Sequence, residues 1–107
     1  MVKESTSLDE LQRKIRELYP ILAERYQVSS MALFGSYVRG EQRPDSDLDV
    51  LVTFRETPGL FKLLQLEHFL SDVLGVQVDL VMKESLKPRI GKHILEEAIP
   101  IYEADIS

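Results

Sequence analysis

Residues 35–52 read GSYVRGEQRPDSDLDVLV. The stretch begins with Gly-Ser directly after the apolar segment 28–34, and it ends in a second apolar segment that starts at Asp47. A glycine at the end of a buried strand lets the backbone turn sharply and lets a ligand approach it closely. Ser36 then offers a hydroxyl at the start of a predicted short helix, where free N–H groups favour phosphate. The stretch therefore predicts two strands joined by a loop that can bind a phosphate.

Two aspartates open the second of these strands, which we predict at 47–54. Asp47 and Asp49 lie two residues apart, so their side chains point to the same face of the strand. The other face is apolar and must lie in the core; it carries Leu48, Val50, Val52 and Phe54. A later strand, predicted at 76–82, has Asp79 among apolar neighbours. If the two strands are adjacent, Asp79 joins the pair and three carboxylates converge.

This carboxylate pattern predicts a metal site made without His or Cys. Carboxylates placed side by side repel one another unless a cation lies between them, and hard divalent ions such as Mg²⁺ are the usual partners. Three convergent carboxylates can hold two metal ions about 3.5–4 Å apart, the geometry used for in-line phosphoryl or nucleotidyl transfer. An isolated Asp-x-Asp is more often a solvated strand start. The order of strand, Gly-Ser, ten residues and Asp-x-Asp in a strand is far more restrictive.

The two ends of the chain predict further elements around these strands. Ser7 and Glu10 form a capping box at the start of a helix whose apolar residues repeat at helical spacing. Pro20 cannot donate to the helical ladder, so a kink or break is expected there. Near the other end, the pattern predicts a helix at about 88–98 and a short edge strand near 101–102, where Pro100 suits a sheet edge.

A middle helix is predicted from Thr57, as N-cap, with Pro58 at its first position, to about Leu74, where Gly75 can end it. The sequence therefore predicts one domain over residues 1–107, with a core at about 8–103, of the α/β (α+β) class. Apolar side chains cover well over half of the circumference of this middle helix. Either the helix is wedged between the sheet and the N-terminal helix, or part of it forms a protein interface.

The composition excludes several classes of protein. The 107 residues are 44% apolar and 29% charged, with a net charge of −5 and no cysteine, which removes disulfides, Cys-ligated zinc, iron–sulfur clusters and thiol nucleophiles. The lack of cysteine also fits a reducing compartment, and we expect a cytoplasmic protein. No apolar run approaches the ~18 residues of a membrane-spanning helix. The acidic balance argues against a nonspecific duplex-binding module, but not against a nucleotide substrate, because a metal can invert the local charge.

The motif resembles that of the nucleotidyltransferase superfamily of DNA polymerase β, and more closely the minimal nucleotidyltransferases that act as antitoxins in HEPN/MNT toxin–antitoxin modules. The resemblance rests on Gly35-Ser36, Arg39-Gly40, Ser46 and Asp47-Leu48-Asp49. The likeness extends over about residues 8–103. It implies the polymerase β-like nucleotidyltransferase fold, which is a small mixed β-sheet flanked by helices.

The resemblance also implies roles for individual residues, with two Mg²⁺ ions as cofactors. Asp47 and Asp49 would ligate both metals, and Asp79 would complete the site of the metal that activates the incoming hydroxyl. These three aspartates are the expected catalytic and metal-ligating residues. Gly35 and Ser36 would hold the β- and γ-phosphates of the nucleotide.

The implied activity is transfer of AMP from ATP to a hydroxyl, a tyrosine, of a cognate HEPN RNase toxin. The alternative is a catalytically silent antitoxin that neutralises the toxin by stoichiometric binding. The implied partners are ATP and the toxin, without membrane association or stable nucleic-acid binding, and a homo- or hetero-oligomer is possible.

Other polar residues have two interpretations each. Arg39 lies beside the predicted phosphate site and could steady the loop or contact the nucleotide's phosphate; the same holds less strongly for Arg43. Tyr37 could pack against the sheet or stack on adenine. His68 and His93 lack ligand partners at suitable spacing, which favours structural or exposed positions. A basic cluster that is either a solvated face or a contact for the triphosphate or a partner consists of Lys83, Lys87, Arg89 and Lys92.

Overall fold

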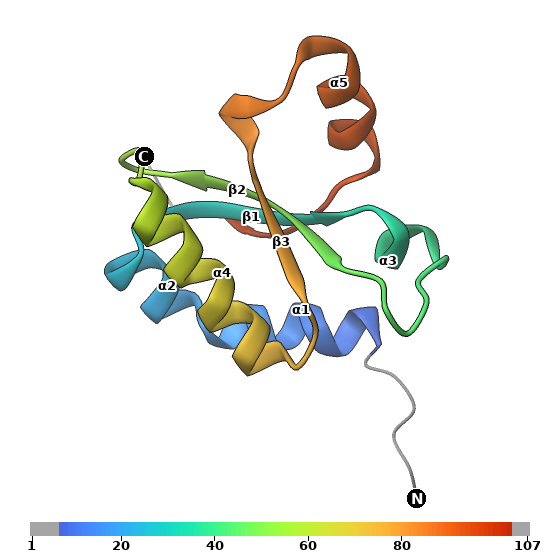
Figure 1. The fold of residues 1–107 in the computed structure, drawn as a ribbon, viewed down its shortest axis with the longest axis horizontal. Helices are drawn as coiled ribbons and strands as arrows, with labels where there is room; N and C mark the ends of the chain where they lie inside the picture. The colour runs from blue at the N-terminus through green and yellow to red at the C-terminus, as the bar shows by residue number, and fades with distance from the viewer. Residues whose placement is uncertain (1–6, 104–107) are drawn as a thin grey trace, which may run out of the picture.

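A four-stranded sheet lies at the centre of the structure, a computed structural model that describes residues 7–103 (Figure 1). The strand order is β3-β2-β1-β4, with β1 antiparallel to β2 and β4, and β2 parallel to β3. The elements are α1 (Leu8–Glu17), α2 (Tyr19–Arg25), β1 (Val28–Phe34), α3 (Ser36–Arg39), β2 (Leu48–Phe54), α4 (Leu60–Leu74), β3 (Val78–Met82), the 3-10 turn η1 (Lys83–Ser85), α5 (Pro88–Glu97) and β4 (Ile99–Glu103). The predicted mixed sheet flanked by helices is therefore confirmed. Residues 1–6 and 104–107 of the predicted domain lie outside the described part.

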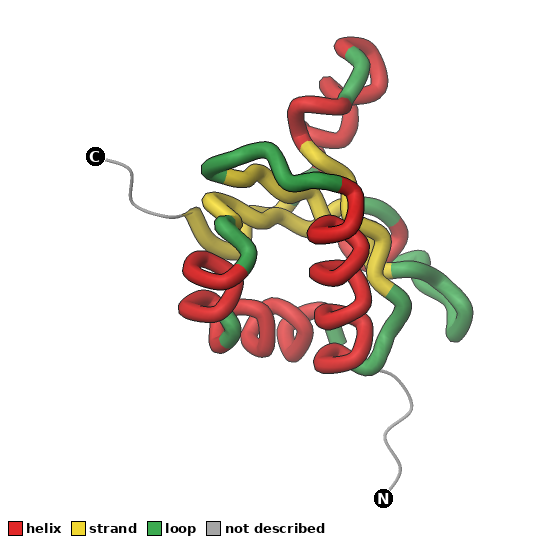
Figure 2. Tube along the Cα trace, turned by 60° about the vertical axis from the view of Figure 1, so that its left-hand side comes forward, coloured by secondary structure: helices red, strands yellow, loops and turns green. Residues whose placement is uncertain are grey.

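The layers are uneven on the two sides of the sheet. The helices α1, α2 and α4 cover one face, whereas α5 stands on the opposite side (Figures 1 and 2). The apolar face predicted for β2 lies in the core, with Leu48, Val50 and Val52 fully buried and Phe54 packed against them. None of the helices within residues 7–103 is long and apolar enough to cross a membrane.

The N-terminal helices form as their sequence predicts. The Ser7 hydroxyl caps α1 by accepting a hydrogen bond from the Glu10 N–H at 3.1 Å. The helix ends at Glu17, and α2 begins at Tyr19 with Pro20 in its first turn. Backbone N–H groups in the first turn of a helix have no acceptor within the helix, so a proline there costs no hydrogen bond. The break predicted at Pro20 is therefore confirmed.

The predicted start of the middle helix is wrong. The helix α4 begins at Leu60 with Gly59 as its N-cap, and no side chain caps it. The Thr57 hydroxyl donates instead to Glu84 at 3.3 Å, so it is engaged with the segment after β3 and not with the helix end. The predicted end is confirmed, because Gly75 adopts the left-handed conformation at φ 74°.

The outer edge of β3 is closed by side chains of α4. Because β3 is an edge strand, alternate N–H groups point away from β2 and need other acceptors. The Ser71 hydroxyl accepts from the Val78 N–H at 3.0 Å, and the Glu67 carboxylate accepts from the Leu80 N–H at 3.0 Å. The helix that precedes the strand thus satisfies the strand's outward donors.

The two faces of α4 should differ sharply in their effect on stability. Leu70 is fully buried, whereas the Phe61 side chain is 82% exposed. We expect Leu70→Ala to lower the free energy of unfolding by about 2–5 kcal/mol, because it leaves a cavity. Phe61→Ala should change it by less than about 0.5 kcal/mol. Urea denaturation of both variants checks this, and equal losses would contradict the buried-face assignment.

Candidate active site

The turn after β1 requires glycine for two reasons. Gly35 is buried and adopts φ 85°, ψ −156°, a conformation that is almost restricted to glycine. Its carbonyl accepts from the N–H groups of Val38 and Arg39, which starts the short helix α3. A Cβ atom placed on Gly35 would lie 2.1 Å from Oδ2 of Asp49. The space that a side chain would occupy is therefore filled by the Asp49 carboxylate.

The aspartates of the two parallel strands lie side by side. Asp49 on β2 is in register with Asp79 on β3, so the predicted adjacency of these strands is confirmed. Asp47 lies one residue before β2 begins and is exposed. The three backbone positions are therefore adjacent at the end of β2 that meets the Gly35 turn.

The three side chains do not form a closed metal cage. Within residues 7–103, no group of three acidic or histidine side chains is arranged to hold a metal ion. The Asp49 carboxylate turns towards Gly35, and Asp79 is exposed on the edge strand. Like charges repel, so carboxylates without a cation between them are expected to point apart.

Electrostatics show that negative charge is crowded here. Burial, together with the charges of Asp79 and Asp47, raises the pKa of Asp49 from 3.8 to about 6. Burial and the neighbouring Glu67 and Asp47 also raise the pKa of Asp79. A set of crowded, oxygen-only donors suits a hard divalent cation, which would relieve the repulsion. The residues present therefore fit Mg²⁺, provided that the side chains rotate towards it.

We expect Asp49→Asn to stabilise the metal-free protein at pH 7. Because folding raises the pKa of Asp49, the folded state binds this proton more tightly than the unfolded chain. The group contributes stability at low pH that is lost as the pH rises through about 6. In the presence of a chelator, the unfolding free energy of Asp49→Asn should exceed the wild-type value above this pH, and the excess should shrink towards pH 3.8.

The control for this prediction is Asp45→Asn, which removes an exposed carboxylate from the same loop. Its pH profile of stability should follow that of the wild type. An Asp49→Asn profile parallel to the wild type across the whole range would contradict the crowding described above.

A fourth acidic residue, which the sequence did not indicate, contacts the Gly35 turn. Glu97 at the end of α5 accepts the Gly35 N–H at 2.6 Å and the Arg39 Nη1 at 3.1 Å. The Nε of Arg39 also donates to Glu41 at 2.9 Å. No sequence motif marks Glu97. In the folded sheet Leu33 pairs with Ile99, and continuing this antiparallel register by two residues brings residue 97 opposite residue 35.

A cavity of about 370 Å³ adjoins this turn. Its floor includes Gly35, Arg39 and Asp49, and α5 supplies Ile90, His93, Ile94 and Glu97 as a wall. His93 is exposed, as one of its two predicted interpretations had it, and it also faces this cavity. Tyr37 is buried in the core cluster, so the packing interpretation is correct for it.

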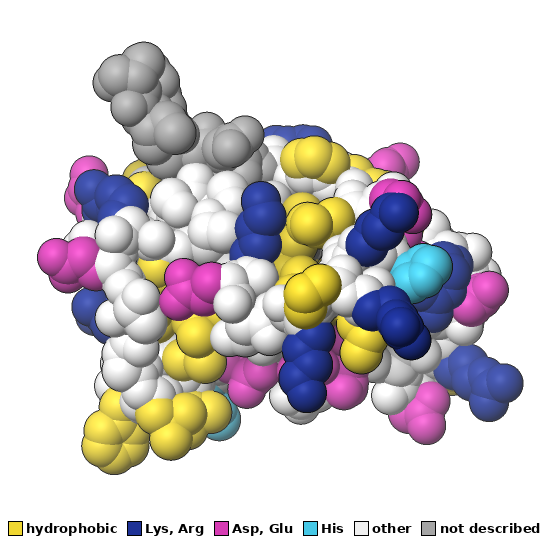
Figure 3. Space-filling view, turned by 90° about the horizontal axis from the view of Figure 1, so that it is seen from above, with side chains coloured by type: hydrophobic (Ala, Val, Ile, Leu, Met, Phe, Trp, Pro, Cys, Tyr) yellow, Lys and Arg dark blue, Asp and Glu magenta, His cyan; other side chains and the backbone are white. Residues whose placement is uncertain are grey.

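The basic cluster lies on the exposed surface of η1 and α5. Its four members are exposed: Lys83, Lys87, Arg89 and Lys92. Seen from the α5 side, blue Lys and Arg side chains alternate with acidic and apolar ones (Figure 3). Exposure fits the interpretation as a solvated face, and the interpretation as a triphosphate or partner contact stays a prediction.

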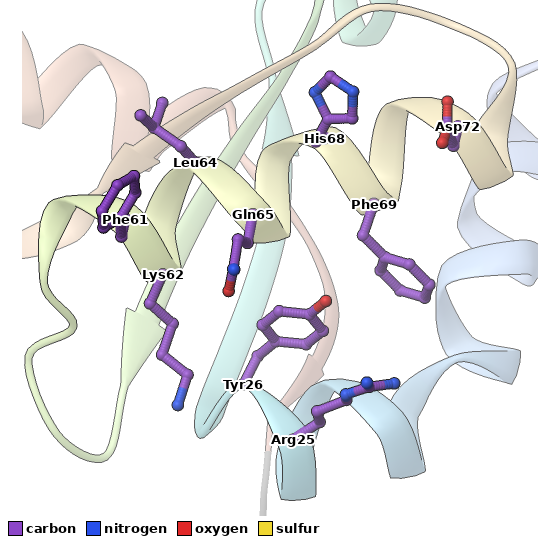
Figure 4. Close-up of a pocket in the computed structure, with 9 residues that line it drawn as sticks. All are labelled: Arg25, Tyr26, Phe61, Lys62, Leu64, Gln65, His68, Phe69 and Asp72. Atoms are coloured by element: carbon purple, nitrogen blue, oxygen red, sulfur yellow. The ribbon is translucent and has the colours of Figure 1, made fainter.

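The larger groove of the structure lies between α2 and α4, away from the carboxylates (Figure 4). It has a volume of about 750 Å³, and the Tyr26 and Phe69 rings stack within it at 5.6 Å. The helix α4 contacts β3 and α1, and its Leu66, Leu70 and Leu74 are buried in the core cluster, so much of its apolar surface is structural. Leu60 is 72% exposed, and the interface interpretation for this end of α4 stays a prediction.

Comparison with known proteins identifies the family. The nucleotidyltransferase domain family matches this chain over residues 15–101, which is most of its length. The chain belongs to the nucleotidyltransferase domain family. Its matched region runs from before β1 into the first residues of β4, and it therefore includes the whole Gly35 turn, all three aspartates and Glu97. The family resemblance drawn from the motif is confirmed.

Individual relatives of this nucleotidyltransferase agree with that assignment. The protein adenylyltransferase MntA of Thermococcus cleftensis is 46% identical over 93 residues, covering 87% of this chain and 94% of the relative. A solved structure assigned as a minimal nucleotidyltransferase has a TM-score of 0.75 at 41% identity, covering 92% of this chain and 99% of that one. A structure of the tri-AMPylated Shewanella oneidensis HEPN toxin with the MNT antitoxin shares the fold, with a TM-score of 0.67 at 21% identity, covering 90% of this chain and 72% of that one.

Proposed function

We propose that this nucleotidyltransferase is a protein adenylyltransferase that transfers AMP from ATP to a tyrosine hydroxyl of a cognate HEPN toxin in the cytoplasm. The observation that carries the proposal is the register of Asp49 with Asp79 beside the Gly35 turn. Two comparisons support the substrate. The Thermococcus cleftensis relative is named a protein adenylyltransferase, and a structural neighbour contains an AMPylated HEPN toxin with its antitoxin.

The proposed reaction places each site residue in a role. Asp47, Asp49 and Asp79 would hold two Mg²⁺ ions, which supply positive charge to the triphosphate and to the departing pyrophosphate. Gly35 and Ser36 would hold the β- and γ-phosphates. The acceptor oxygen forms a bond to the α-phosphorus of ATP, and the bond from that phosphorus to its bridging oxygen breaks. Asp79 would orient the acceptor hydroxyl or take its proton.

The test is intact-mass spectrometry of the purified HEPN partner after incubation with the protein, Mg²⁺ and each nucleoside triphosphate in turn. We expect mass increases of one or more AMP units with ATP, and none when a chelator is added. Peptide mapping should then place the modification on a tyrosine. No mass increase with any of the four nucleotides would count against transferase activity.

A second function is stoichiometric neutralisation of the toxin. The apolar surface left exposed at Leu60 and Phe61 is the observation that favours partner binding without chemistry. In that case Asp49→Asn would still inhibit the RNase at equimolar ratio, and inhibition would need neither ATP nor Mg²⁺. Catalytic silencing instead predicts inhibition at substoichiometric ratios that depends on ATP.

A further inference from the structure

One side chain of α5 joins both ends of α3 to the rest of the site. The Glu97 carboxylate accepts the Gly35 N–H at 2.6 Å, and both of its oxygens lie 3.1 Å from Nη1 of Arg39. Its side chain is 26% exposed, whereas that of Arg39 is 47% exposed. Hydrogen bonds in which the acceptor is ionised are shorter and stronger than neutral ones. The contact with Gly35, at 2.6 Å, is short even for such a bond.

The helix that carries Glu97 is otherwise loosely packed. Gly91 is the one buried residue in the range Pro88–Glu97, and Ile90 and Leu95 are exposed. Within residues 7–103, Glu97 supplies the side-chain hydrogen bonds that connect α5 to the Gly35 turn. The position of this turn is therefore linked to the end of α5 by this carboxylate, in addition to the pairing of β4 with β1.

We propose that Glu97 is a positioning residue, which holds the Gly35-Ser36 turn in the conformation that places Asp49 and Ser36 for the reaction. Glycine adopts this backbone region without a steric penalty but also has many other conformations open to it, so its contacts must select this one. Glu97 fixes the N–H of that peptide, while the Gly35 carbonyl accepts from the first N–H groups of α3. The inference rests on the proposed function, since it assigns Glu97 a part in that reaction.

The same contacts assign a supporting role to Arg39. Its guanidinium is paired with Glu97 and Glu41, so its positive charge is balanced by carboxylates of this chain. In this arrangement Arg39 steadies the loop through Glu97, which is one of the two interpretations drawn from the sequence. The opposite model is a Glu97 carboxylate that occupies the place of a phosphate and must be displaced by the nucleotide.

The kinetic test compares three variants. Glu97→Ala removes the acceptor, Glu97→Gln keeps one acceptor oxygen for the Gly35 N–H, and Glu96→Gln makes the same charge change at the exposed neighbour. We expect Glu97→Ala to lower kcat/KM for ATP by about 10- to 100-fold, since small displacements of reacting groups have effects of this size. Glu97→Gln should recover most of the loss, and Glu96→Gln should match the wild type. A loss of thermal stability alone, with kcat/KM unchanged at 25 °C, would overturn the proposal.

Two further measurements do not depend on turnover. In Glu97→Ala, the Gly35 amide proton should shift upfield in a ¹H–¹⁵N NMR spectrum, whereas in Glu96→Gln it should not move. Binding of AMP-PNP with Mg²⁺, measured by calorimetry, should weaken about tenfold in Glu97→Ala. An unmoved Gly35 amide, or unchanged or tighter AMP-PNP binding, would overturn the positioning role. If the wild type transfers no AMP, the proposed function fails. The amide shift and the AMP-PNP affinity still decide whether Glu97 holds the Gly35 turn in the conformation that binds the nucleotide.

Discussion

Asp49→Asn is expected to reduce the rate of AMP transfer by about 1,000-fold or more while the protein stays folded. Asparagine keeps the shape of the side chain but removes the negative charge that a divalent cation needs. A metal ion contributes several kcal/mol to the stabilisation of such transition states, and about 4 kcal/mol corresponds to a factor of 1,000. Initial rates of partner modification at saturating ATP and Mg²⁺ provide the measurement.

The matched control for this loss of activity is Asp45→Asn, which removes the same charge from the loop before β2. Its transfer rate should equal that of the wild type, because Asp45 is not among the three adjacent aspartates. Circular dichroism should show both variants folded. An Asp49→Asn rate within about threefold of the wild type would exclude Asp49 from the reaction, since a lost metal ligand is worth far more.

The second large effect is expected at Gly35. Gly35→Ala forces a Cβ into a site 2.1 Å from Oδ2 of Asp49, so the carboxylate must rotate away. It also places alanine in a backbone conformation that costs about 1–3 kcal/mol. We expect transfer activity to fall about 100-fold, because the methyl group displaces the Asp49 carboxylate and blocks the close approach of a nucleotide to the Gly35 turn. The same rate assay, together with thermal unfolding, separates the two effects.

Gly40 provides a matched comparison at the other end of α3. It has a positive φ of 74°, but a Cβ there would meet nothing within 4 Å. Gly40→Ala should therefore lower stability by about 1–2 kcal/mol through backbone strain, and it should leave activity near the wild-type level. If the two alanine variants lost activity equally, strain in the loop and not the contact with Asp49 would be the cause.

Local patterns were sufficient to predict most of the framework. The alternation in β2 identified its core face, and Gly75 marked the end of α4, because each depends on neighbours within a few residues. The Thr57 cap was predicted wrongly since its hydroxyl has a competing partner, Glu84, which lies 27 residues later in the chain. Local preference alone cannot reveal such a distant competitor.

The site was only partly accessible to the same reasoning. Spacing predicted Asp47 and Asp49 on one strand, whereas β2 begins at Leu48 and leaves Asp47 one residue before it. Asp79 followed once β3 was assumed to be the neighbour of β2. Glu97 lies 62 residues from the Gly35 N–H that it accepts, and no motif joins them. Its position follows from the pairing of β4 with β1, which is a property of the folded sheet and not of any sequence segment.

The closed edge of β3 also limits how copies of this chain can associate. An open edge strand can recruit a strand from another molecule, and repetition of that pairing leads to fibrils. Here two of the outward donors, at Val78 and Leu80, are already bound to Ser71 and Glu67. A further strand added at this edge would first have to break both bonds. The helix α4 thus disfavours strand-to-strand association of copies of this chain at the β3 edge.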